Sequence, residues 1–148
     1  MSEPSRHTVT STLEFPYRRS LGPVMGGFMT ALRDHKLMGI RNRAGDVICP
    51  PLEHDPATGE DLGTDLVEVG PGGEVTSWTW VGEPSPRHPV DHPFAFALIR
   101  LDGASTALVH LVDADMTAMH TGMRVVPRWR GEPEGKITDI EAFVPEGS

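Results

Sequence analysis

Two histidines, His88 and His92, are the sharpest candidates for chemistry in the sequence, and they lie four residues apart in the stretch RHPVDHP. On a helix, that spacing would place two metal ligands on one face, as in zinc proteases. Prolines at positions 86, 89 and 93 exclude a helix here, and no glutamate stands where the protease motif has its base. The stretch therefore predicts a rigid loop that serves recognition, and metal binding is the weaker interpretation.

A second cluster places Glu53, His54 and Asp55 side by side in the stretch LEHDP, where they could supply an acid/base group. Adjacent side chains of an extended loop point in different directions, so these three do not form a dyad by themselves. Solvated loop residues are the favoured interpretation.

His110 and Cys49 are expected to be structural. His110 alternates with apolar residues in TALVHLVDA, which predicts a hydrogen-bonded histidine within a sheet. Cys49 would need a base and an electropositive setting to act as a nucleophile, whereas the nearby Asp46 has the wrong sign. We therefore expect Cys49 to be a small buried residue.

Three arginines, Arg124, Arg128 and Arg130, alternate along MRVVPRWR and predict a basic stripe on one face of a strand. Such a stripe could bind phosphate groups or an acidic partner surface. Two glutamates follow within four residues, so a solvated strand face is the alternative. Together with His92, these arginines are the predicted ligand-binding residues, and no catalytic residue is assigned.

The charge of the chain limits its partners. Its 148 residues include 13 basic and 21 acidic side chains, for a formal net charge of -8, which opposes binding to nucleic acid or anionic lipid. Aromatic residues could serve as base-stacking platforms, but the basic groove that must accompany them is missing. A single cysteine excludes an intrachain disulfide and a four-cysteine zinc site. No apolar run resembles a signal peptide core or a membrane span, so we expect a cytoplasmic protein.

Four segments must position these residues. Residues 1–20 are polar, with two prolines, and predict an extended arm. Residues 21–37 predict a helix, because apolar residues fall at i, i+4, i+7 and i+8 from Val24. Residues 38–65 predict a small hairpin around an Ala-Gly-Asp turn, followed by an irregular loop. Residues 66–148 predict a run of strands.

The fold class is therefore mainly β. The last segment is predicted to contain five strands, with a short helix between the third and the fourth. A helix at that place is typical of an OB-fold, a five-stranded Greek-key barrel whose open end the helix plugs. Regular strand spacing alone would fit other barrels, and the position of the helix favours the OB-fold.

The order of these motifs resembles the DUF35 family, whose members pair an N-terminal helix and a rubredoxin-like zinc ribbon with a C-terminal OB-fold. The resemblance runs from GPVMGGFMTALRDHKLMGIR to DIEAFV and is carried by GGEVTSWTWV, HPFAFALIRLDGASTALVHLVDA and TGMRVVPRW. In that family the ribbon typically carries two Cys-x-x-Cys pairs, one after the Gly-Ile-Arg position and one after the double proline. Here Asn42 follows Gly-Ile-Arg, and neither pair is present. We therefore expect a degenerate ribbon that folds without zinc, and no cofactor.

The resemblance also implies auxiliary work in a hetero-oligomer. DUF35 proteins are similar to partner subunits of thiolase-fold, lipid-transfer-protein-like thiolases and aldolases, including those of steroid side-chain degradation, and help to shape an acyl-CoA site. The predicted partner-binding residues lie on the arm and on the helix stripe: Phe15, Tyr17, Val24, Phe28 and Leu32. The alternatives are a small hydratase or lyase that uses His54 or His92 on an acyl-CoA, and a nucleic-acid-binding OB module, against which the charge already counts.

Overall fold

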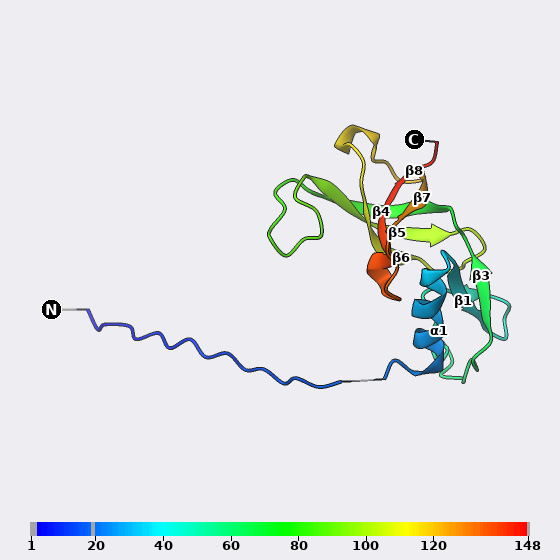
Figure 1. Ribbon diagram of the computed structural model, residues 1–148, viewed down its shortest axis with the longest axis horizontal. Helices are drawn as coiled ribbons and strands as arrows, with labels where there is room; N and C mark the ends of the chain where they lie inside the picture. The colour runs from blue at the N-terminus through cyan, green and yellow to red at the C-terminus, as the bar shows by residue number, and fades with distance from the viewer. Residues whose placement is uncertain (1–2, 19, 148) are drawn as a thin grey trace.

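The computed structural model describes residues 3–18 and 20–147. An extended arm precedes one α-helix, a small three-stranded sheet and a closed five-stranded barrel. Figure 1 shows the arm pointing away from the rest of the chain, while the helix and the small sheet lie together beside the barrel. No helix within the described ranges is long and apolar enough to cross a membrane.

Helix α1 covers Gly22–Arg33, with Pro23 in its first turn, where a proline loses no helical hydrogen bond. Beyond the helix, His35 takes a positive φ of 57°, and the N–H of Lys36 donates to the carbonyl of Ala31 at 3.0 Å. The prediction of a helix as far as residue 37 is therefore wrong at its end. A left-handed residue reverses the chain and terminates the helix four residues sooner.

The apolar stripe of α1 faces the chain's own core. Val24, Phe28 and Leu32 are at most 2% exposed. Gly27 lies so close to the small sheet that a Cβ there would come within 3.0 Å of Leu66 Cδ1. This glycine therefore permits a close approach between the helix and the sheet of the same chain.

The small sheet has the strand order β2-β1-β3, with β1 at Leu37–Arg41, β2 at Val47–Ile48 and β3 at Leu66–Val69. Both neighbours run antiparallel to β1, with Ile40 opposite Ile48 on one side and opposite Leu66 on the other. The predicted hairpin between β1 and β2 is confirmed. Because β3 pairs with β1, the residues from 66 to 69 belong to this sheet, and the barrel strands begin after them.

The barrel is formed by β4 (Gly73–Val81), β5 (Phe94–Leu101), β6 (Leu108–Val112), β7 (Arg124–Trp129) and β8 (Ile140–Pro145). They close in the order β4-β5-β6-β8-β7. A 3-10 helix, η1, lies between β6 and β7 at Met116–Ala118, and a second one, η2, precedes β8 at Ile137–Asp139. The predicted mainly β fold with a five-stranded OB-type barrel is confirmed.

The barrel interior is filled by alternating strand residues, such as Ala95, Ala97, Ile99 and Leu101 of β5, each at most 3% exposed. A second, smaller apolar cluster lies on the outside of the barrel. It joins Phe94, Leu111 and Ala142 to partly buried residues that include Val90 of the proline-rich loop between β4 and β5. The loop therefore covers part of the outer barrel surface, where the candidate site lies.

Candidate functional site

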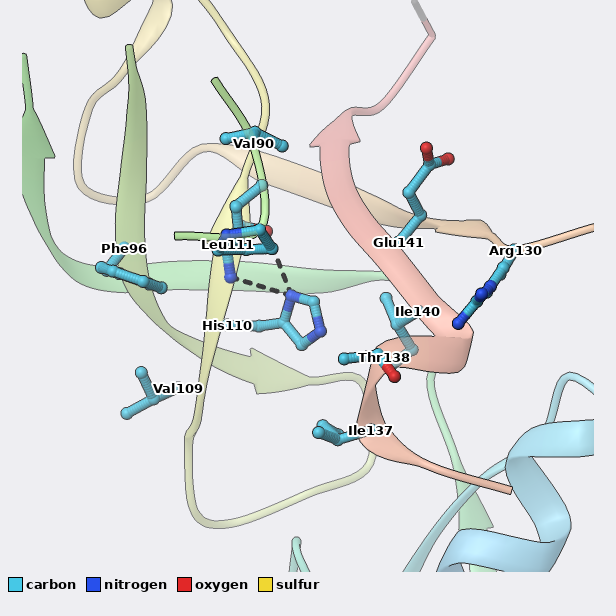
Figure 2. Close-up of a pocket in the computed structure, with 11 residues that line it drawn as sticks. Val90, Phe96, Val109, His110, Leu111, Arg130, Ile137, Thr138, Ile140 and Glu141 are labelled. Carbon is cyan, nitrogen blue, oxygen red and sulfur yellow. Dashed lines mark hydrogen bonds between the residues drawn. The ribbon is translucent and has the colours of Figure 1, made fainter. Parts of the chain in front are cut away.

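The barrel has a weak seam between β6 and β8. These two strands are parallel and share one register pair, Val112 with Phe143. The N–H of Asp113 donates to the carbonyl of Phe143 at 2.8 Å at that point. Toward the start of β6 the strands diverge, and η2 lies on the far side of the opening (Figure 2).

This opening forms a crevice of about 490 Å³. Most of its lining is apolar and comes from β5, β6, η2, β8 and the proline-rich loop: Pro89, Val90, Phe96, Val109, His110, Leu111, Arg130, Ile137, Thr138, Ile140 and Glu141. Figure 2 shows Val90 over Leu111 on one side and Ile137 with Thr138 on the other. The crevice is thus suited to an apolar ligand or an extended apolar segment.

His110 forms the floor of the crevice. Its Nδ1 accepts the backbone N–H of Leu111 at 2.8 Å, which places the proton of a neutral ring on Nε2, and its ring meets Phe143 edge to face at 5.3 Å. Burial lowers the pKa of His110 below its ordinary value, so the ring is neutral at pH 7. This confirms the prediction of a hydrogen-bonded sheet histidine.

Charged residues stand at the rim of the crevice. Arg130 lies 3.6 Å from Glu134, and Glu141 lies 3.0 Å from Arg128. Glu141 is exposed, whereas Leu111 and Ile140 of the apolar lining are buried. The rim therefore gives the crevice a polar edge around an apolar interior.

A second hollow, on the other side of Arg128, contains two of the predicted ligand-binding residues. His92 Nε2 bonds to Asp113 Oδ1 at 2.9 Å, and Arg128 Nη2 donates to Asp113 Oδ2 at 3.0 Å. Arg128 Nε donates onward to Glu141 at 3.0 Å. The proline-rich loop is thereby tied at His92 to the end of β6, and through Arg128 to β7 and β8.

These bonds change the ionisation of the linked groups. The hydrogen bond to Asp113 raises the pKa of His92. Partial burial opposes ionisation of Asp113, but the bonds from His92 and Arg128 outweigh it and hold the pKa of that carboxyl below its ordinary value. A histidine oriented by a carboxylate is an arrangement that can transfer protons.

The predicted basic stripe is not a free cationic surface. Arg124 donates to both carboxylate oxygens of Asp102, at 2.7 and 2.5 Å, and lies 3.3 Å from Glu146. The strand is also irregular at Arg128 and Trp129, so Arg130 does not continue the alternation. Each of the three arginines is paired with a carboxylate, and the ligand-binding role of the stripe stays a prediction.

The predicted partner-binding residues divide into two groups. Phe15 and Tyr17 are 73% and 78% exposed on the arm, whereas Val24, Phe28 and Leu32 are buried within the chain itself. The prediction that the helix stripe meets a partner is therefore wrong, because that face of α1 already packs on the chain's own core. The role of Phe15 and Tyr17 stays a prediction.

Sequence reasoning missed the outer barrel face. Val109 is 63% exposed and Leu98 is 40% exposed, and the two lie opposite each other on β6 and β5. The signal was present, because LVHLV is apolar at outward as well as inward positions, which is typical of a strand covered on both faces. His54, the other proposed acid/base residue, forms a bridge with Asp61 in the loop before β3, remote in sequence from the crevice.

The residues present do not fit a zinc ion. Within the described ranges, no group of three or more His, Cys, Asp or Glu side chains is placed to hold a metal. Cys49 is buried, and burial raises the pKa of its thiol to about 12, so it stays protonated at pH 7. Where the resemblance implies cysteine pairs, Asn42 Nδ2 donates instead to Asp55 Oδ2 at 3.2 Å.

Comparison with known proteins agrees with this geometry. The family model of the C-terminal OB-fold domain of ChsH2 matches residues 66–130. Among solved structures, a chain of the "Ltp2-ChsH2(DUF35) aldolase" is similar with 24% identity and a TM-score of 0.64, over 86% of this chain and 98% of that chain.

A DUF35 protein of unknown function from Sulfolobus solfataricus is similar with 16% identity and a TM-score of 0.65, over 84% of this chain and 87% of that chain. No curated protein matches the sequence significantly. At these identities the two structures establish the fold, and they extend the likeness beyond the barrel to the helix and the small sheet.

Proposed function

We propose that this chain, which its barrel and its two structural relatives assign to the DUF35 family, is a non-catalytic subunit of a thiolase-fold, lipid-transfer-protein-like aldolase or thiolase. The observation that carries this proposal is the likeness to the DUF35 chain of an aldolase, which extends over 98% of that chain. A subunit of the same shape can occupy the same place beside a related enzyme.

The chemistry of the side chains supports an auxiliary role. The thiol of Cys49 is buried and protonated, and the ring of His110 is neutral and bonded to its own strand. Neither group is available as an activated nucleophile or base. The nucleophile and the acid/base groups of the reaction are therefore assigned to the partner subunit.

Exposed apolar side chains supply the surface for such a partner. Phe15 and Tyr17 stand on the arm, and Val109 and Leu98 stand on the outer barrel face, each at least 40% exposed. Large apolar side chains in water mark interaction surfaces. We assign partner binding to these four residues in place of the buried helix stripe.

The crevice supports the further proposal that the chain helps to form an acyl-CoA site. Its apolar lining suits an acyl chain, and Arg130 at its rim could meet a phosphate in place of Glu134. Steroid side-chain or related acyl-CoA degradation is the pathway we propose, on the strength of the resemblance.

The test is an affinity purification of the tagged chain from its own source, followed by mass spectrometry of the intact complex and of its subunits. We expect a stoichiometric complex with a thiolase-fold subunit, and carbon–carbon cleavage or acyl transfer by the complex. A chain that elutes alone, folded and monodisperse, and that does not bind purified thiolase-fold proteins from the same source would disprove the proposal.

The bond between His92 and Asp113 favours one alternative, a small acyl-CoA hydratase or lyase that acts alone. His92 is held at 2.9 Å by the carboxylate, and its ring is about half exposed, as a proton-transfer group at a binding site would be. This alternative predicts turnover by the isolated chain that H92Q removes. The auxiliary role predicts no turnover by the isolated chain with any acyl-CoA.

A further inference from the structure

We propose that the proline-rich loop between β4 and β5, residues 82–93, is a strap that opens away from the crevice as one unit, with the bond between His92 and Asp113 as its latch. In the closed form the strap supplies one wall of the crevice, through Pro89 and Val90. Its opening governs access to the crevice whatever enters there, so the motion does not rest on the proposed function.

The middle of the strap is held against the barrel by side chains. The ring of His88 meets the ring of Phe94 edge to face, with the ring centroids 5.3 Å apart. Val90 packs on the outer apolar cluster, and Figure 2 shows it over Leu111. No residue of the strap is fully buried, and only Pro84, His88 and Val90 are half-buried. A segment that buries so little apolar surface opens at a smaller free-energy cost than the barrel unfolds.

The latch lies near the end of the strap. His92 Nε2 lies 2.9 Å from Asp113 Oδ1, and the side chain of His92 is 49% exposed. An exposed pair of this kind changes an equilibrium by a factor of about five at most. When the latch breaks, Asp113 keeps the bond that Arg128 Nη2 donates to its other oxygen at 3.0 Å. The carboxylate is therefore not left unpaired, and the strap can open while the barrel stays folded.

The strap also has space to move into. A hollow of about 600 Å³ lies beside it and is lined by residues of the strap itself. Pro89 and Val90 line both this hollow and the crevice, so the two residues stand between the two spaces. Figure 1 shows the loop projecting from the ends of β4 and β5 as an open ring. Displacement of the strap would join the hollow to the crevice and uncover Leu111.

The strap has the stiffness to move as one unit. Two hydrogen bonds close a turn within it: the N–H of Ser85 donates to His88 Nδ1 at 2.9 Å, and the N–H of His88 donates to the carbonyl of Ser85 at 3.0 Å. Opening breaks neither bond, since both partners belong to the strap. Four prolines restrict the backbone further, because each fixes its own φ: Pro84, Pro86, Pro89 and Pro93.

The first test measures how fast thiols of the full chain react with iodoacetamide, with each site quantified by mass spectrometry. L111C places a thiol beneath the strap, and the native Cys49, 1% exposed in the core, reports global unfolding in the same sample. V109C is the matched control on the same strand, at a residue that is 63% exposed. We expect the thiol of L111C to react at least about tenfold faster than Cys49 and at least about tenfold slower than that of V109C.

Two results of this test would overturn the proposal. A rate equal to that of Cys49 would show that the strap opens only when the whole chain unfolds. A rate equal to that of V109C would show that the strap does not cover Leu111. A142C places a thiol in the same apolar cluster with a smaller change of side chain, and it repeats the measurement if L111C fails to fold.

The second test concerns the latch. H92Q, added to L111C, should speed the reaction of the introduced thiol by about two- to fivefold, because the bond to Asp113 is weakened. H120Q is the control, since His120 is an exposed histidine outside the strap, and it should leave the rate unchanged. An unchanged rate in H92Q, or an equal increase in both variants, would overturn the role of His92 as the latch.

Discussion

Asn42 and Asp55 join the turn of the β1-β2 hairpin to the loop that follows the double proline, through a hydrogen bond of 3.2 Å from Asn42 Nδ2 to Asp55 Oδ2. Asn42 Oδ1 also accepts the N–H of Asp46 at 2.9 Å, and Asp55 Oδ1 accepts that of Ala57 at 2.8 Å. Asp55 is only 7% exposed. A polar cross-link therefore holds together the two segments in which the resemblance to the DUF35 family implies cysteine pairs.

This cross-link predicts the stability of the chain without metal. N42A leaves the buried Asp55 carboxylate without one of its donors, and we expect it to lower the free energy of unfolding by about 1–3 kcal/mol. EDTA should leave the midpoint of urea unfolding unchanged. E83Q, a substitution at an exposed residue, is the control and should leave the free energy of unfolding unchanged. A fall in stability on chelation would contradict the interpretation, since it would reveal a bound metal.

Asp139 predicts a dependence of stability on acid. This buried carboxylate accepts the N–H groups of Glu134 and Gly135 at 2.7 Å and that of Lys136 at 3.3 Å. Burial opposes its ionisation, but these three bonds prevail and hold the pKa of Asp139 below its ordinary value. Its contribution to stability is therefore present above the unfolded pKa of about 3.9, and it is lost as pH falls through the lower folded pKa.

We expect D139N to be less stable than the native chain at pH 7, by about 1–3 kcal/mol, because a neutral amide replaces a charged acceptor. This difference in the free energy of unfolding should shrink below about pH 4, because acid protonates the Asp139 carboxylate first in the unfolded chain and then, at lower pH, in the folded chain. Urea unfolding at pH 7 and pH 3 measures it. If the two chains differed in the free energy of unfolding by the same amount at pH 7 and pH 3, the charge of Asp139 would not contribute to stability.

Sequence reasoning predicted the barrel correctly because its signals are local. Alternation along β5 and β6 and the position of η1 between the third and fourth barrel strands suffice to indicate an OB-type barrel. The end of α1 was missed because it depends on the left-handed conformation of His35, which histidine adopts more often than most residues but still only in a minority of cases.

The site was harder to predict, because it depends on pairings between distant segments. The stripe of Arg124, Arg128 and Arg130 looked free in the sequence, but its carboxylate partners Asp102 and Asp113 come from other turns of the barrel. The crevice exists because β6 and β8 diverge after one register pair, and no local pattern reports where two strands separate. The helix stripe of Val24, Phe28 and Leu32 was assigned to a partner for a similar reason, because its sequence does not show that it packs against distant segments of the same chain.

The bond between His92 and Asp113 predicts a titration that can be followed by NMR. The carboxylate raises the pKa of His92, so D113N should lower that pKa toward the ordinary value of about 6.5. D115N removes a neighbouring carboxylate that is not bonded to His92, and should change the titration less. If both variants titrate alike, the bond is not formed in solution.

The same bond gives stability a dependence on pH of opposite sign to that of Asp139. Because the folded pKa of His92 is raised, its contribution is fully present below about pH 6.5 and is lost as pH rises through the folded pKa. We expect the difference in stability between the native chain and H92Q to be larger at pH 6 than at pH 9. A difference that grows toward pH 9 would contradict the assignment.

The last prediction separates the partner surface from the core. F15A/Y17A removes two exposed rings from the arm, so the free energy of unfolding should stay within about 0.5 kcal/mol of the native value while the affinity for the partner subunit falls. F28A, on the helix stripe, should instead cost about 3–5 kcal/mol of stability, because Phe28 is 1% exposed and its loss leaves a cavity. Urea unfolding and partner titration on the same samples distinguish the two effects. If F28A kept the native free energy of unfolding and lost only its affinity for the partner subunit, the helix stripe would be a partner interface. In that case Phe28 would not be buried in the core of the free chain.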